Sequence, residues 1–250
     1  MSFGAGVGSM PGEDYVAALR VVIDETPDLV AIPELPARGV QAAMTGRGIG
    51  ILAELGADLQ PAGWRLTGAG SGADQRRARS LLAQDLDTVE EQLQGFEGQL
   101  KIQVAGPWTL AATVERPRGD RILADHGGRR DLAQSLAEGI RQHLASVSGR
   151  VPGASLVLQI DEPMLPAVLA ARIPTASGWG RHRSIDKPEA DEALRLVVEA
   201  GRDSGALTVM HSCAPDVPVD LVAGAGFDAL SFDLSLTAPG DVWAAAFDGG

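Results

Sequence analysis

The feature that most constrains the fold is an alternation of short apolar segments with long amphipathic stretches. The apolar segments predict strands near residues 3–9, 28–35, 100–107, 155–162, 207–213 and 227–234. Several are almost continuously apolar, which is typical of strands covered on both faces. Stretches with helical spacing lie between them, at 11–26, 72–96, 127–149 and 186–205. This order of elements favours a parallel sheet with helical crossovers.

Polar residues close each predicted strand, and this favours an α/β fold of the (β/α)8 TIM barrel type. The closing segments read GS, PEL, GPWT, DEP, HSC and FD. Active sites of such barrels gather at the C-terminal ends of the strands, whereas an open doubly wound sheet concentrates its site at one switch point. We therefore expect residues 1–250 to form a single barrel domain. Because only six strands are predicted, we expect the barrel to be truncated after about six β/α units, unless two chains complete each other.

Composition and charge narrow the class of function. The net charge of −12 opposes binding to a phosphate backbone, and the scarcity of aromatic residues opposes base stacking. A single cysteine excludes an internal disulfide framework. The first residues lack the features of a signal peptide, and no apolar run approaches the roughly 20 residues of a membrane span. We expect a cytoplasmic protein that acts on a small molecule, with no nucleic-acid or membrane partner and an undetermined oligomeric state.

The one cysteine, Cys213, follows His211 by two positions at the end of a predicted strand. Alternate residues of a strand share a face, so both should point into the barrel mouth while Ser212 points outward. Imidazole nitrogen and thiolate sulfur can chelate zinc, and Asp233, at the end of the next strand, can add an oxygen. Three protein ligands and one open position are typical of a catalytic zinc. The alternative is that Cys213 is simply a small buried apolar residue.

An open zinc position supports two kinds of chemistry. The ion can bind a substrate thiol and stabilise its thiolate, the nucleophilic form, which then accepts a methyl group. It can equally activate a water molecule for hydrolysis. The residues alone leave both reactions open.

Four further strand-end residues are candidates for binding a substrate. Asp161 is the one of the pair Asp161–Glu162 that we expect to face the ligand, where it can bind an ammonium group; a salt bridge to a helix is the alternative. Glu34 lies between two prolines that stiffen its loop, although an exposed loop glutamate is equally consistent. Ser9 precedes a helix start whose free N–H groups can hold an anion such as a carboxylate. Trp108 can form the floor of a pocket or pack in the core.

The segments GVGSMPG, IPELP, VAGPWTL, LQIDEP and HSCAP, in this order, resemble the catalytic domain of cobalamin-independent methionine synthase. The likeness is to the short, single-barrel members of that family and extends over nearly the whole chain. Its most specific part is QIDEP followed about fifty residues later by His-x-Cys. The resemblance implies a zinc-bearing (β/α)8 barrel that methylates the thiol of homocysteine to form methionine.

The resemblance also implies a set of zinc ligands. His211 and Cys213 match the family's first two ligands, and Asp233 falls where the family has a glutamate. The family takes another cysteine from its last strand and has a histidine near its seventh strand. This sequence contains no second cysteine. We therefore expect an altered ligand set with weaker affinity for the metal.

Substrate positions are implied in the same way. Ser9, Glu34 and Asp161 match positions that hold the amino acid group of homocysteine, and Asp161 is the catalytic candidate among them. Trp108 lies in the segment near the methyl donor, which we expect to be a methylated folate or a methylated corrinoid. Two other functions remain open: a methylcorrinoid:thiol methyltransferase with a different thiol acceptor, or a non-catalytic fragment or degenerate homologue. An acceptor without an amino acid group would not need these carboxylates.

Overall fold

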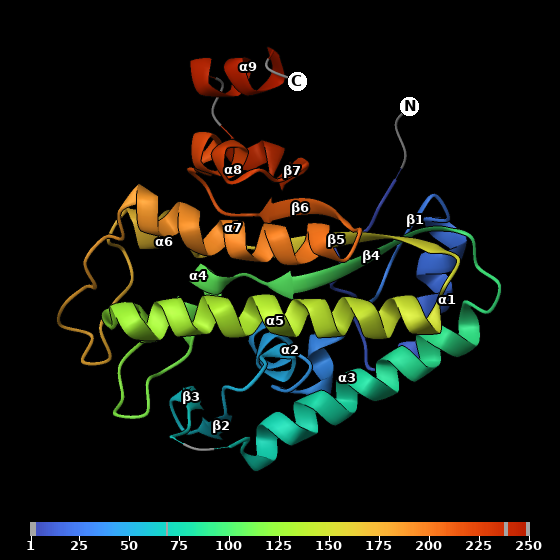
Figure 1. The fold of residues 1–250 in the computed structure, drawn as a ribbon, viewed down its shortest axis with the longest axis horizontal. Coiled ribbons are helices and arrows are strands. Elements are labelled where there is room, and N and C mark those ends of the chain that lie inside the picture. The colour runs from blue at the N-terminus through green and yellow to red at the C-terminus, as the bar shows by residue number, and fades with distance from the viewer. Residues whose placement is uncertain (1–3, 69, 238–239, 249–250) are drawn as a thin grey trace.

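Five parallel strands form a curled sheet in the computed structural model, which describes residues 4–68, 70–237 and 240–248 (Figure 1). Their order in the sheet is β1-β4-β5-β6-β7, with every pair parallel. The five strands are β1 (Leu29–Ala31), β4 (Gly98–Ala105), β5 (Ala154–Asp161), β6 (Leu207–Ser212) and β7 (Ala229–Phe232). Strands that follow one another in chain order, without a reversal, are the arrangement of a barrel and not of a doubly wound sheet.

Helices connect the strands and cover one side of the sheet. The long helices α5 and α7 lie side by side against it, with α3 running beneath α5 in the view of Figure 1. Among the described residues the α-helices are α1 (Tyr15–Glu25), α2 (Met44–Ile51), α3 (Ala73–Gln92), α4 (Pro107–Thr113), α5 (His126–Arg150), α6 (Leu165–Leu169), α7 (Lys187–Asp203), α8 (Val219–Ala225) and α9 (Asp241–Asp248). The single-turn 3-10 helices are η1 (Pro36–Arg38), η2 (Ile122–Ala124) and η3 (Leu234–Leu236).

The local sequence explains why α7 forms where it does. Asp186 precedes the helix and accepts a hydrogen bond from the backbone N–H of Glu189, which satisfies one of the free donors of the first turn. Pro188 occupies the first turn, where its missing N–H costs nothing. Leu194 and Val197 are spaced for one face and are fully buried. Capping therefore fixes where the helix begins, and burial fixes which face meets the sheet.

The two faces of strands β4 and β5 differ in polarity. Apolar side chains such as Ile102 and Leu158 are fully buried, and Leu158 lies close to Gly201 of α7. The alternate residues are buried polar groups: Lys101, Gln103, Gln159 and Asp161. Because successive strand residues point to opposite faces, these four groups share the face turned away from α7. This inner face is polar where a filled barrel would carry branched apolar side chains.

The N-terminal segment does not form the strand predicted at 3–9. Of its described residues, only Ser9 makes a parallel bridge, to Glu34, flanked by backbone hydrogen bonds from Glu34 N to Gly8 O and from Met10 N to Glu34 O. The three glycines between residues 4 and 8 disfavour a regular strand. Gly8 has a φ of 129°, and a Cβ there would lie 2.7 Å from the side chain of Gln103. The segment therefore crosses the polar inner face as an irregular chain.

Other differences from the predicted elements are local. The antiparallel hairpin of β2 (Ala57–Gln60) and β3 (Gly63–Leu66) was not predicted. Strand β4 ends at Ala105, so the residues after it begin helix α4 instead of extending the strand. Closure into a complete barrel is not observed: within the described part of the chain, β1 and β7 are the two outer strands of the sheet. No helix in that part is long and apolar enough to cross a membrane.

Candidate functional site

A cavity of about 370 Å³ lies at the C-terminal ends of β5, β6 and β7. The ends of parallel strands meet at one edge, and the bridge between Ser9 and Glu34 brings the N-terminal segment to the same place. The lining residues are Val7, Ser9, Glu34, Met44, Asp161, Pro163, His211, Cys213, Ser231, Phe232 and Asp233. Six of the seven candidates chosen from the sequence are in this set; Trp108 is not.

His211 is held by the neighbouring strand. Its Nδ1 lies 2.9 Å from Oγ of Ser231 on β7, which orients the ring and leaves Nε2 for another partner. Burial lowers the pKa of His211, and the positive charge of Lys101 lowers it further. The imidazole is therefore kept neutral, which is the form that binds metals. Cys213 is exposed in the same cavity, whereas Ser212 is fully buried outside the lining.

Asp233 is tied to the backbone of the turn that follows it. Its Oδ1 accepts hydrogen bonds from the backbone N and the Oγ of Ser235, at 2.8 and 2.6 Å, and so caps η3. These bonds hold the pKa of Asp233 below its usual value, so the carboxylate stays ionised. Both bonds use the same oxygen. Asp233 therefore contributes a charged group to the cavity, but its orientation is set by η3.

The donor types around the cavity suit zinc, although the side chains are not gathered into a metal cluster. His211, Cys213 and Asp233 offer nitrogen, sulfur and oxygen, the donor atoms found in zinc sites. The bond from His211 to Ser231 resembles the outer contact that usually orients a zinc-bound histidine. Within the residues that the structure describes, however, no three His, Cys, Asp or Glu side chains are close enough to form a site. The three residues therefore match a zinc site in the type of their donor atoms and in their location, but they do not form a cluster around one point.

Glu34 is a buried carboxylate backed by a chain of charges. It is 6% exposed, and its Oε1 lies 3.2 Å from Nε of Arg47 on α2. Arg47 also pairs with Asp85 of α3, at 3.4 Å, and Asp85 accepts a 2.7 Å bond from Arg38. Burial raises the pKa of Glu34, while the charge of Arg47 opposes that change. Two arginines and two carboxylates thus alternate behind the cavity, with Glu34 at its wall.

Asp161 and Glu162 have separate roles because they point in opposite directions. Asp161 lines the cavity, and burial raises its pKa to about 7. Glu162 is fully buried and accepts hydrogen bonds from the backbone N–H groups of Trp108 and Thr109 and from the Thr109 hydroxyl. It therefore satisfies the free donors at the start of α4. The sequence analysis did not assign this structural role to Glu162.

Ser9 is exposed in the cavity lining, and one N–H group at the start of the helix that follows it is already capped. Helix α1 begins at Tyr15, and the side chain of Asp14 already accepts the N–H of Ala17. This N–H is consequently not free for a ligand carboxylate. What Ser9 offers to the cavity is its own hydroxyl and backbone next to Glu34.

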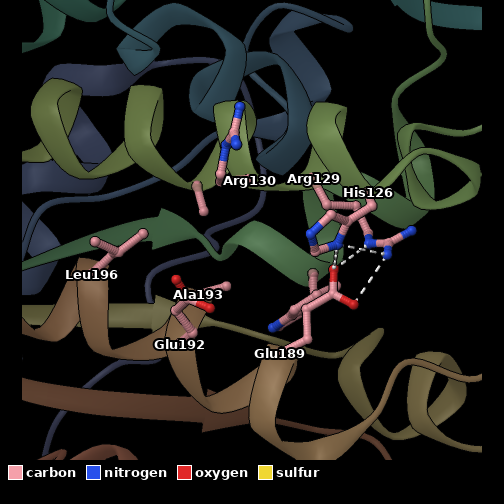
Figure 2. Close-up of a pocket in the computed structure, with 9 residues that line it drawn as sticks. His126, Arg129, Arg130, Glu189, Glu192, Ala193 and Leu196 are labelled. Carbon is pink, nitrogen blue, oxygen red and sulfur yellow. Dashed lines mark hydrogen bonds and ion pairs between the residues drawn. The ribbon is translucent and has the colours of Figure 1, made fainter.

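Trp108 lies apart from this cavity, in helix α4. Its side chain is 1% exposed, and its Nε1 donates a 3.2 Å hydrogen bond to the carbonyl of Ala190. It borders a smaller pocket of about 70 Å³ between α5 and α7. There Glu189 accepts two bonds from Arg129, at 2.7 and 3.0 Å, and lies 3.0 Å from His126 (Figure 2). Trp108 is therefore packed in the core, which is the second of the two positions considered for it from the sequence.

Comparisons with known proteins find structural likeness at low sequence identity. No family model matches the sequence, and no curated protein matches it. The chain is similar to the solved structure of a B12-independent methionine synthase from Shewanella sp. W3-18-1 in complex with selenomethionine, with 16% identity and a TM-score of 0.45. The match covers 82% of this chain and 53% of the other, so the chain spans about half the length of that protein. A likeness this weak does not assign a family or an activity.

Proposed function

We propose that this chain is a zinc-dependent methyltransferase that methylates the thiol of homocysteine to form methionine. One observation carries the proposal: candidate residues from five separate segments of the sequence line a single cavity. These residues are Ser9, Glu34, Asp161, His211, Cys213 and Asp233. The residues are far apart in the sequence, and their side-by-side position in one cavity supports a common role.

Zinc would be held by His211, Cys213 and Asp233. When bound, the ion would lower the pKa of a substrate thiol and so supply the thiolate nucleophile. The neutral His211 ring, oriented by Ser231, is suited to this role. A ligand set without a second cysteine should bind the metal less tightly than one with two thiolates.

Glu34 and Asp161 would bind the amino group of homocysteine. Both carboxylates are buried, and burial raises both pKa values, so an arriving ammonium group would be a favourable partner for them. Ser9 would receive the substrate's carboxylate through its hydroxyl and backbone. Fixing both charged groups of the substrate would orient its sulfur for in-line attack on a methyl carbon. The methyl donor is a methylated folate or a methylated corrinoid.

Metal and ligand binding test the proposal directly. Elemental analysis of the purified protein should find zinc, and both Cys213→Ser and His211→Asn should reduce its content. His126→Asn is the matched control, since His126 lies in the pocket between α5 and α7 and should leave zinc unchanged. Cobalt substitution should produce a sulfur-to-metal charge-transfer band. A folded protein that takes up no metal and binds no homocysteine would show that the proposal is wrong.

The choice of acceptor separates this proposal from a related one. Calorimetric titration with homocysteine and with a simple alkyl thiol compares an acceptor that has an amino acid group with one that lacks it. Preference for homocysteine, lost in Asp161→Asn and Glu34→Gln, is the expected result. Equal binding of both thiols would instead favour a methyltransferase with another thiol acceptor.

A further inference from the structure

Two buried residues that the proposed chemistry does not use connect to Asp161. Lys101 of β4 donates a 2.6 Å hydrogen bond to Oε1 of Gln159 on β5. Gln159 in turn donates through Nε2 to Oδ1 of Asp161, at 2.7 Å. All three residues are at least 95% buried, and all lie on the polar inner face of the sheet. They form a continuous line of hydrogen bonds that ends at the cavity.

The chemistry of the three groups fixes the direction of this line. An ammonium group only donates, so its partner on the Gln159 amide must be the oxygen, and the amide NH2 group that remains only donates. The amide of Gln159 must therefore turn its oxygen to Lys101 and its nitrogen to Asp161. Only one oxygen of Asp161 is engaged, since no described residue donates to Oδ2. The rotamer of Asp161 is thus held through Oδ1 while its second oxygen remains available.

The same two residues also hold the N-terminal segment. Lys101 donates a 2.6 Å bond to the carbonyl of Gly6, and Gln159 donates a 3.0 Å bond to the carbonyl of Val7. Ser9 lies two residues after Val7 and bridges to Glu34. One pair of buried side chains therefore positions both Asp161 and the segment that carries Ser9 to the cavity.

We propose that Lys101 and Gln159 are positioning residues for substrate binding, which fix Asp161 and the segment of Ser9 in the geometry that receives an amino acid. This inference rests on the proposed function. The positive charge of Lys101 also lies near both carboxylates of the cavity, Glu34 and Asp161, and favours their ionised forms. Burial lowers the pKa of Lys101 to about 8, so the amine is still largely charged at neutral pH.

Homocysteine affinity in matched variants tests the inference. Gln159→Leu removes all three hydrogen bonds of this side chain, and Gln159→Glu keeps the shape but replaces the donor to Asp161 and Val7 with an acceptor. Both should weaken binding at least tenfold in calorimetry. Lys101→Met should act in the same direction, and Lys101→Arg should restore part of the affinity. In an activity assay the loss should appear mainly as a higher KM.

Gln103 provides the control. It is the neighbour of Gln159 in the β4–β5 register and equally buried, yet its amide atoms have no hydrogen-bond partner among the described residues. Gln103→Met should change homocysteine affinity less than twofold. If Gln103→Met and Gln159→Leu weaken binding equally, the effect is one of general packing and the inference is wrong.

A second measurement distinguishes failure of this inference from failure of the proposed function. If the wild-type protein binds no homocysteine, the proposed function is wrong, and the line of hydrogen bonds is then judged without ligand. The side-chain amide protons of Gln159, assigned by their loss in Gln159→Leu, should exchange slowly with water in NMR spectra. They should shift in Asp161→Asn and stay unchanged in Gln103→Met. Fast exchange in the wild-type protein would overturn the inference.

Discussion

At the scale of single residues, the charges behind the cavity are buried and mutually dependent. Arg47 is 5% exposed and is shared between Glu34 and Asp85. A buried ion pair adds little net stability compared with apolar packing, but removing one partner leaves an uncompensated charge. Replacing Arg47 should therefore lower the free energy of unfolding by much more than the long distances of its ion pairs suggest.

Arg47→Met should lower the free energy of unfolding by about 3–5 kcal/mol, because two buried carboxylates lose their common partner. Urea titration followed by circular dichroism measures the change. Arg77→Met is the control: its side chain is 70% exposed in an ion pair with Asp74, and its loss should cost about 0–1 kcal/mol. Equal stabilities of the two variants would contradict this account.

His143 predicts a pH dependence of stability. It is buried in α5, and burial lowers its pKa to about 4, with Arg47 and Arg150 adding to the effect. The unfolded chain has a histidine pKa of about 6.5, so between pH 6.5 and 4 the unfolded state binds more protons. Acidification through this range should therefore destabilise the protein.

The expected slope from His143 alone is up to about 1.4 kcal/mol per pH unit. Urea titrations of the wild-type protein and of His143→Gln at pH 4.5, 5.5 and 7 isolate the contribution of His143, because all other titrating groups contribute equally to the two proteins. The stability of the wild-type protein should fall more steeply on acidification than that of the variant. Parallel profiles would show that His143 does not titrate as an uncharged buried group.

Sequence motifs identified the groups at the cavity wall but not the residues that support them. Asp161 ends strand β5, and Ser9 and Glu34 form a bridge beside it, so the chain topology brings these groups together. The support for Glu34 comes from Arg47, and its contact exists only after α2 packs. The sequence nevertheless contained a signal for these supporting residues. One arginine lies among small and apolar residues in MTGRGIGI, and polar residues lie inside the apolar strands LKIQVA and LVLQID. Such isolated polar residues are typical of buried groups with a specific partner.

At the scale of elements, the junction of β5 and α4 depends on one carboxylate. Glu162 accepts three hydrogen bonds from Trp108 and Thr109 at the helix start. Gly106 allows this close approach, since a Cβ there would lie 2.3 Å from Oε1 of Glu162. The last strand residues and the first helical turn are thereby held together.

Glu162→Ala should lower the free energy of unfolding by about 2–5 kcal/mol, because buried donors lose their acceptor, at about 1–3 kcal/mol each. Gly106→Ala should also destabilise, since its methyl group displaces the same carboxylate. Glu192→Ala, on the exposed surface of α7, is the control and should change stability by about 0.5 kcal/mol or less. Chemical denaturation compares all three. If Glu162→Ala were as stable as the wild-type protein, water would replace the carboxylate as hydrogen-bond acceptor without loss of stability, and this account would be wrong.

Elements with strong periodicity were predicted well, and those set by long-range contacts were not. Helices α3, α5 and α7 agree with the sequence to within a few residues, because their apolar spacing is local, as are the side-chain caps of α5 and α7. The segment 3–9 looked like a strand by its apolar residues, yet its glycines and the polar surface beneath it prevent one. The hairpin β2–β3 is too short to leave a clear pattern of alternation.

At the scale of the whole molecule, the sequence predicted consecutive strands side by side in an incomplete barrel, but not which strands form the edges of the sheet. Alternating strands and helices favour right-handed crossovers, which place consecutive strands beside each other. The observed order follows that rule from β4 to β7. Closure depends on pairing between the outermost strands, and strand patterns carry no information about that pairing. The described residues form half of such a barrel.

The distribution of the core predicts how stability varies across this half-barrel. One contiguous apolar cluster joins residues from Tyr15 to Ala225, and the central strands β4 and β5 lie within it. Strand β7 is half-exposed and pairs only with β6, and the described side chains of α9 are mostly exposed. Regions with few buried contacts open with a small free energy, whereas the centre opens only on global unfolding.

Native-state hydrogen exchange should therefore be slowest in β4, β5 and α5 and fastest in α9 and β7. Urea below the denaturing concentration should steeply increase the exchange rates of the central amides, because they exchange through global unfolding. The exchange rates of the α9 amides should stay nearly unchanged. The amides of β6, which lie between β5 and β7, serve as an internal reference and should be intermediate. Equal protection in β7 and β4 would mean that the outer strand is covered in solution, because an uncovered edge strand has too few contacts to match the centre.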